Sequence, residues 1–209
     1  MLDIIKQIFL GIMFNFQILP ETLITGICIL GVILANNSIV IMAAGGIGVQ
    51  LLATIMGKLI MKFMPGTAVP TSSMDMCQNG FIAKSWSRLL SGNPDTLWHP
   101  NAPSIFMATI TYFFGYGLAV QTLYSDEIQA GIKQRSVMIG LSIAAALIIL
   151  CAMIFRCASG CDSILGTTLG AIFGLMVGYL GAIILGYITN RRATNIWGIP
   201  LLRNRVRVI

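Results

Sequence analysis

The sequence predicts an all-α fold, a polytopic transmembrane helical bundle of five spans with a further N-terminal helix. Of the 209 residues, 56% are hydrophobic and only 10% are charged, whereas a soluble domain carries about 25% charged residues. The apolar residues gather in runs of roughly 20, the length a helix needs to cross about 30 Å of hydrocarbon. Backbone groups in lipid must bond to one another, so these runs are expected to be helical. Residues 1–209 are expected to form a single membrane domain.

The two N-terminal segments are the least regular. Leu2–Leu19 is apolar but interrupted by charged and amide side chains, which fits either an amphipathic helix in the interface or a sixth span. Interfacial placement is favoured slightly, and Pro20 ends the segment in either case. No cleavable signal peptide is expected, because Lys6 lies inside the apolar run. Glu21–Ala35 is shorter and almost purely apolar, and it is predicted as a span.

Four longer spans follow a tight polar turn at residues 36–38. They are predicted at Ser38–Phe63, Pro103–Tyr124, Ser136–Phe155 and Ile164–Ile188. Between the first two lies a long polar loop, about 64–102. Loops longer than about 15 residues are usually functional or carry their own structure, and Phe81–Leu90 is predicted as a short interfacial helix.

Alternating spans define two membrane faces. The loop face carries the 64–102 loop, the start of the span at Pro103 and the Arg156–Ser163 turn. The tail face carries the Ser125–Arg135 turn and the basic C-terminal tail 189–209. Basic residues next to a span favour the cytoplasmic side, so the tail face is expected to be cytoplasmic or its equivalent.

The tail is the most basic part of the chain, and it is expected to meet anionic lipid headgroups or a partner protein. Its arginines are Arg191, Arg192, Arg203, Arg205 and Arg207. Nucleic-acid binding is disfavoured, because Trp197 is the only aromatic residue among these charges. The five cysteines form no metal-binding pattern, and no metal or cofactor is predicted.

Small residues recur at every fourth position of the last span. They are Gly166, Gly170, Gly174, Gly178 and Ala182. Residues four apart share one helix face, and small residues let membrane helices approach closely. The stripe therefore predicts helix packing, either within one bundle, which is favoured, or at an oligomer seam or ligand groove. The small residues between Ala43 and Gly48 are the expected packing partner.

Polar groups that could carry chemistry are few. Arg156 and Asp162 are the charged residues nearest the membrane on the loop face. The favoured interpretation makes Arg156 a snorkelling helix end and Asp162 a cap for the helix starting near Ser163. A transporter would need polar groups at mid-membrane, and Gln50 and Gln121 are the best candidates.

Three motifs resemble the type 2 phosphatidic acid phosphatases, six-helix enzymes that remove phosphate from lipids. Their signature joins a Lys, six residues and Arg-Pro; Pro-Ser-Gly-His; and Ser-Arg, five residues, His, three residues, Asp. Here the corresponding stretches are Lys58 to Met64-Pro65, Pro103-Ser104-Ile105-Phe106, and Phe155-Arg156 followed by Gly160-Cys161-Asp162. The resemblance implies vestigial phosphate-site residues at Lys58, Ser104, Arg156 and Asp162.

The departures from that signature argue against catalysis. The family's mechanism uses two histidines, one as nucleophile and one as acid or base. The chain has one histidine, His99, outside both motif positions. No catalytic residue is therefore predicted.

The leading hypothesis is a non-catalytic structural or assembly subunit of a membrane-associated complex, meeting other subunits through the 64–102 loop and the tail. The ending Trp197–Asn204 resembles small inner-membrane proteins of large icosahedral DNA viruses, which implies a virion membrane. The alternatives are a lipid-phosphate phosphatase-like enzyme or lipid-binding relative, and a small-solute transporter.

Overall fold

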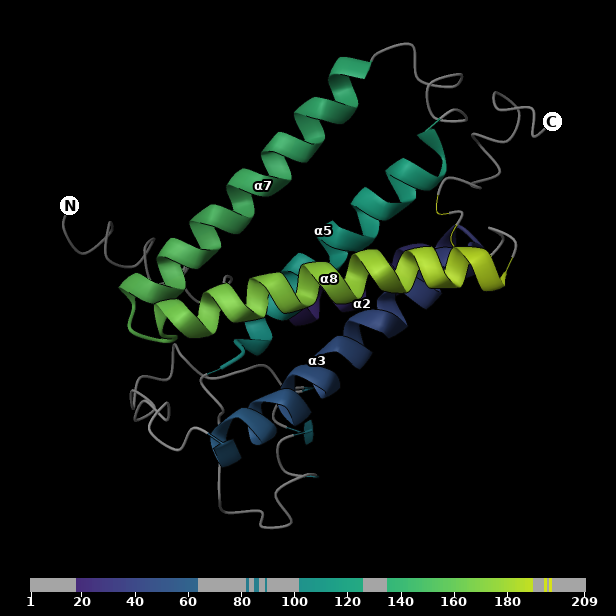
Figure 1. Cartoon of the computed structure of the whole chain (residues 1–209). Coiled ribbons are helices and arrows are strands. Elements are labelled where there is room, and N and C mark those ends of the chain that lie inside the picture. Colours follow the sequence, from purple (N-terminus) through teal and green to yellow (C-terminus); the bar gives the residue numbers. More distant parts are fainter. Residues whose placement is uncertain are drawn as a thin grey trace, which may run out of the picture.

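The computed structural model describes residues 18–63, 102–125 and 135–189, with single positions near residue 85 and at residues 194 and 196. Every regular element in this part of the chain is a helix, which confirms the predicted all-α fold. The helices are α2 (Leu19–Ile33), α3 (Asn37–Phe63), α5 (Ile105–Leu123), α7 (Arg135–Ala158) and α8 (Ile164–Ile188) (Figure 1).

Four of these helices, α3, α5, α7 and α8, are long and apolar enough to cross a membrane. The chain is therefore a multi-pass membrane protein. The fifth predicted span forms α2, whose 15 residues rise only about 22 Å at 1.5 Å per residue, short of the hydrocarbon thickness. Most of Leu2–Leu19 lies outside the described residues, as does the greater part of the 64–102 loop.

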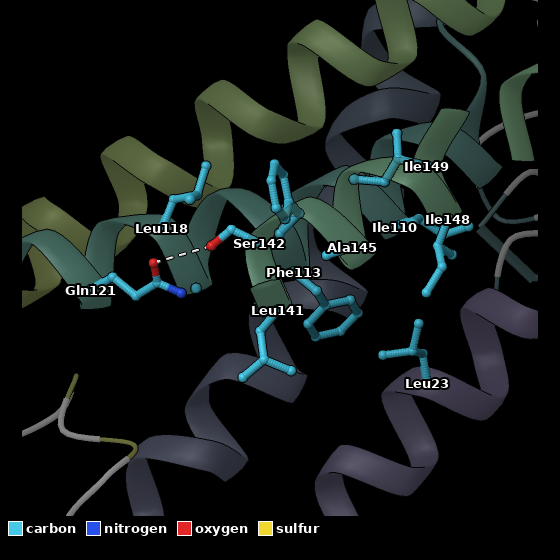
Figure 2. A pocket seen from close by; sticks show the side chains of 12 residues that line it. Leu23, Ile110, Phe113, Leu118, Gln121, Leu141, Ser142, Ala145, Ile148 and Ile149 are labelled. Atoms are coloured by element: carbon cyan, nitrogen blue, oxygen red, sulfur yellow. Dashed lines mark hydrogen bonds between the residues drawn. The ribbon is translucent and has the colours of Figure 1, made fainter. Parts of the chain in front are cut away.

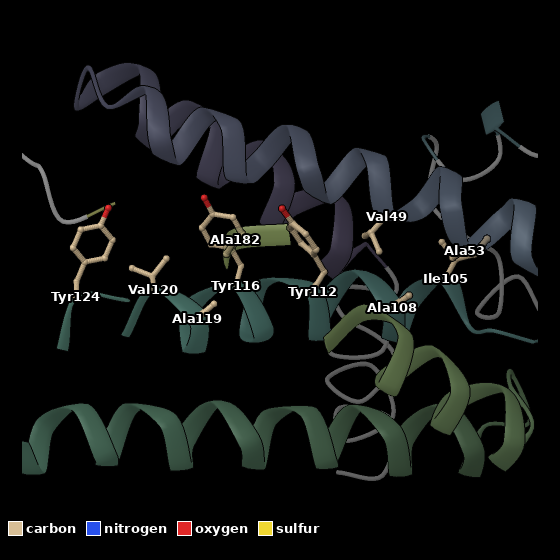
Figure 3. Packing of buried hydrophobic residues seen from close by; sticks show 10 residues of the cluster. All are labelled: Val49, Ala53, Ile105, Ala108, Tyr112, Tyr116, Ala119, Val120, Tyr124 and Ala182. Atoms are coloured by element: carbon tan, nitrogen blue, oxygen red, sulfur yellow. The ribbon is translucent and has the colours of Figure 1, made fainter. Parts of the chain in front are cut away.

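Helix α5 is the centre of the bundle. In its span 67% of the residues are buried, compared with 11% in α7. One side of α5 carries Tyr112, Tyr116 and Val120, which pack with Val49 and Ala53 of α3 (Figure 3). Helix α7 diverges from this core, starting at the turn that it shares with α8 (Figure 1).

The glycine stripe of α8 packs against α5, not against the Ala43–Gly48 segment as the sequence suggested. A Cβ added at Gly170 would lie 2.5 Å from the carbonyl oxygen of Ser104. Gly174 and Gly178 face the backbone carbonyls of Ala108 and Tyr112 in the same way. The two backbones come into contact because the glycines of α8 carry no side chain, the close approach that small residues allow between membrane helices.

The small residues of α3 accommodate aromatic rings instead. Gly45 lies against the hydroxyl end of Tyr112, and Gly46 lies against the Phe113 ring. The Tyr112 hydroxyl donates to the Met42 carbonyl at 3.3 Å. The small residues of α3 therefore pack against side chains of α5, whereas the stripe of α8 packs against the backbone of α5.

At the tail face, the start of the C-terminal tail is tied to the bundle. The Asn36 amide donates to the Ile196 carbonyl at 3.2 Å. The hydroxyls of Tyr124 and Thr194 lie 3.1 Å apart, and Thr194 is fully buried. The tail therefore leaves the bundle beside the α2–α3 turn, while its five arginines lie outside the described residues.

Candidate functional site

A buried ion pair lies at the loop-face end of the bundle. Arg156 Nε donates to Asp162 Oδ2 at 2.7 Å, and the two side chains are only 4% and 8% exposed. Arg156 belongs to the last turn of α7, and Asp162 lies in the short connection to α8. The backbone N–H of Asp162 also donates to the Arg156 carbonyl, at 3.3 Å. The turn thus folds the carboxylate back onto the guanidinium.

Ser104 brings a third helix to this pair. Its hydroxyl donates to the same Asp162 oxygen at 2.7 Å. Its hydroxyl oxygen also accepts from the Met107 N–H at 3.3 Å, so Ser104 is the N-cap of α5. The Ser104 N–H donates to the Gly166 carbonyl at 2.9 Å. We call Ser104, Arg156 and Asp162 the Arg156 cluster; it joins the ends of α5, α7 and α8.

The turn that carries Asp162 follows from two local features. Gly160 has φ +68°, a left-handed conformation that glycine adopts without steric cost, and it ends α7. Ser163 then caps α8 by accepting from the Gly166 N–H at 2.9 Å. The cap is therefore Ser163 and not Asp162, contrary to the interpretation from sequence. Asp162 is left to bind Arg156 and Ser104.

Arg156 is not a snorkelling helix end either, since only 3% of the residue is exposed. Its guanidinium carbon lies 4.8 Å from the centroid of the Phe106 ring, a cation–π contact that replaces part of the lost hydration. The guanidinium is thus held between a carboxylate and an aromatic face. The contact with Phe106 was not predicted from the sequence.

The other candidate residues are Lys58, His99, Gln50 and Gln121. No hydrogen bond or ion pair among the described residues joins the half-buried Lys58 of α3 to the Arg156 cluster. His99 lies outside the described residues. Gln50 is buried in α3 with its Oε1 lacking a partner, whereas Gln121 lines a pocket between other helices. The two glutamines of the transporter hypothesis therefore do not share a described cavity.

A cysteine next to the cluster is oxidised. Cys161 is disulfide-bonded, whereas Cys28, Cys151 and Cys157 are free thiols. No group of three or more metal-ligating side chains occurs in the described ranges.

The two charges of the cluster are paired with each other. Asp162 Oδ2 accepts from both the Arg156 guanidinium and the Ser104 hydroxyl at a buried position. Such an arrangement holds helices in register, because breaking any contact leaves a buried polar group without its partner. No family model, curated protein or solved structure matches this chain.

Proposed function

We propose that the protein is a non-catalytic multispanning membrane protein that acts as a structural or assembly subunit of a membrane-associated complex. The Arg156 cluster is the observation that carries this proposal. Phosphoryl chemistry requires a cation that meets the phosphate oxygens and a nucleophile or base beside it. Here the Arg156 guanidinium is paired with Asp162, 2.7 Å away, and Phe106 covers its face.

Electrostatics gives the physical reason. A carboxylate in contact with a guanidinium cancels the charge that would attract a phosphate, and it repels the phosphate itself at the same short range. The burial of both side chains strengthens each effect, since little water screens them. The cluster therefore favours a structural role, in which the ion pair ties three helix ends together.

The assembly part of the proposal rests on α7. Large aliphatic side chains such as Ile139, Ile143 and Leu147 are exposed along it. Gly140 and Ala144, four residues apart, are also exposed, and a Cβ added at Gly140 meets nothing within 4 Å. Small residues at this spacing let another membrane helix approach closely. We therefore assign a partner's helix to this face of α7.

The proposed subunit also meets its partners through the 64–102 loop and the basic tail. The hydrogen bond from the Asn36 amide to the Ile196 carbonyl supports a contact through the tail, because it holds the start of the tail at the edge of the bundle. The resemblance of the ending Trp197–Asn204 supports a virion inner membrane as the site of assembly.

A Gly140→Leu variant tests the assembly surface. The new side chain points away from the rest of the chain and blocks an incoming helix, so folding is expected to persist while partners are lost. The measurement is the mass and composition of the complex purified in mild detergent. Gly181→Leu is the matched control, because a Cβ at Gly181 of α8 also meets nothing within 4 Å. The proposal would be contradicted if the wild-type protein purifies with no other protein present in a fixed molar ratio.

A lipid-phosphate-binding or hydrolysing relative is the second candidate. The observation in its favour is that Ser104, Arg156 and Asp162, three of the four residues implied by the phosphatase resemblance, lie together on the loop face.

We expect the wild-type protein to release no phosphate from phosphatidic acid beyond the release in protein-free detergent micelles. Released inorganic phosphate is measured beside an Arg156→Lys variant, which keeps the charge but loses the planar donor geometry. The enzymatic proposal would replace the structural one if the wild-type protein releases phosphate and the Arg156→Lys variant, still eluting as folded protein, does not.

A further inference from the structure

A pocket of about 350 Å³ lies between α2, α5 and α7, on the side where α7 diverges (Figure 2). Apolar side chains make its walls, among them Leu23 of α2, Phe113 and Leu118 of α5, and Ile149 of α7. None of its described lining residues is charged. From Ile110 to Gln121 the pocket follows α5 for about 16 Å at 1.5 Å per residue, so it is elongated along this helix.

One end of the pocket is polar. The Ser142 hydroxyl donates a long and weak hydrogen bond to Gln121 Oε1, at 3.4 Å. The Gln121 nitrogen is turned away from Ser142 (Figure 2) and donates to none of the described residues. Gln121 is two residues from the end of its candidate span and Ser142 is three residues from the start of its own. The polar pair therefore lies within one helical turn of the tail-face boundary.

We propose that this pocket binds one acyl chain of a lipid, with the carbonyl group of the chain at the Gln121–Ser142 pair. An ester or carboxyl oxygen accepts from the unused amide N–H of Gln121, at the depth where the chain meets its headgroup. The hydrocarbon then runs along α5 toward the middle of the membrane. This site is on the tail-face side of the bundle, at the opposite end from the Arg156 cluster, and it does not depend on the function proposed above.

Three observations select an acyl chain. The pocket lies among helices that cross the bilayer, where lipid chains are the solvent. Its uncharged walls offer no counter-charge to an ionic ligand, and burying an unpaired charge there would be costly. Its polar atoms gather at one end, which matches a molecule with one polar terminus and an apolar body.

Gly117 offers a means to block the site. It lines the pocket, and a Cβ added there meets no atom within 4 Å. A Gly117→Leu side chain therefore enters the space assigned to the lipid without displacing the backbone. Gly181→Leu introduces the same side chain on α8, on a face outside the pocket. Ala145→Phe, on the α7 wall, provides a second block should Gly117→Leu lower the yield of folded protein.

The test uses protein reconstituted in phosphatidylcholine vesicles that contain a trace of lipid with a photoactivatable acyl chain. One arm carries the label on phosphatidylcholine and the other on a free fatty acid, and mass spectrometry maps the adducts. We expect adducts to concentrate on the pocket residues of α5 and α7, and to fall by about tenfold in Gly117→Leu, since several buried methylene contacts are excluded. They should stay unchanged in Gly181→Leu.

The arms identify the source of the chain: labelling by phosphatidylcholine shows a membrane phospholipid, and labelling by the fatty acid alone shows a single-chain lipid. Adducts no denser in the pocket than on the exposed face of α8 would overturn the proposal. So would pocket adducts that appear only after residues 1–17 are deleted, because the N-terminal segment would then be the occupant. Pocket labelling that persists in both blocking variants would also overturn it.

Discussion

Replacing Gly174 with leucine is expected to prevent stable packing of the bundle. A side chain at this position would overlap the Ala108 carbonyl and the Thr111 hydroxyl of α5. Backbone atoms cannot rotate aside as a flexible side chain can, so α8 must move away from the helix that forms the core. Overpacking costs about 1–3 kcal/mol where neighbours adjust, and here we expect the upper end of that range or more. The measurement is the thermal midpoint of the detergent-solubilised protein.

The comparison is with the same substitution at an exposed position of the same helix. A leucine at Gly181 has open space around it, so its midpoint is expected to match that of the wild type. Because the helix, the residue type and the added volume are identical, the difference isolates the contact with α5. Equal midpoints for the two variants would show that the backbone contact between α5 and α8 contributes little.

Removing the carboxylate by Asp162→Ala is expected to cause the second large loss of stability. Arg156 would remain 3% exposed without its counter-charge, and the Ser104 hydroxyl would lose its acceptor. Breaking one partner of a buried ion pair costs about 3–5 kcal/mol. The free energy of unfolding in mild detergent, obtained by denaturant titration, measures this loss.

The paired variant Arg156→Met with Asp162→Leu separates charge from packing. Replacing a buried ion pair with apolar residues of similar volume is often neutral or stabilising, so the double variant should recover much of the stability lost in Asp162→Ala. A double variant as unstable as the single one would show that the geometry of the cluster matters more than its charge balance.

The spans were predictable to within a few residues because their length and apolar composition are properties of the chain itself. The segment predicted at Ser136–Phe155 is α7, Arg135–Ala158, and that at Ile164–Ile188 is α8. The short Glu21–Ala35 segment forms a helix as expected, but the segment is too short to cross by itself. The length of the apolar segment alone separates α2 from the spanning helices, and that length can be read from the sequence.

The partner of the glycine stripe could not be predicted. A period of four identifies the face of α8 that packs, but it carries no information about which helix lies against that face. The Ala43–Gly48 segment has the right composition and receives Tyr112 and Phe113, while α5, rich in large residues, offers its backbone. Composition indicates which helices approach closely, and topology decides the pairs.

The candidate site was predictable only in part. The resemblance singled out Ser104, Arg156 and Asp162, and the structure places them in contact. Single-residue rules suggested a snorkelling arginine and a capping aspartate, because each rule considers the local helix alone. The Arg156–Asp162 pair and the ring of Phe106 depend on how α5, α7 and α8 meet, as does the pocket that contains Gln121.

The attachment of α7 has a mechanical consequence. The ion pair fixes the loop-face end of α7, while its other end contacts α5 through the long hydrogen bond between Ser142 and Gln121. Since few residues of its span are buried, we expect α7 to tilt about its loop-face end more readily than α5 does. Membranes of different thickness are accommodated chiefly by helix tilt. In a thinner bilayer we therefore expect α7 to tilt further from the membrane normal. The separation between α5 and α7 would then change with the thickness of the surrounding bilayer.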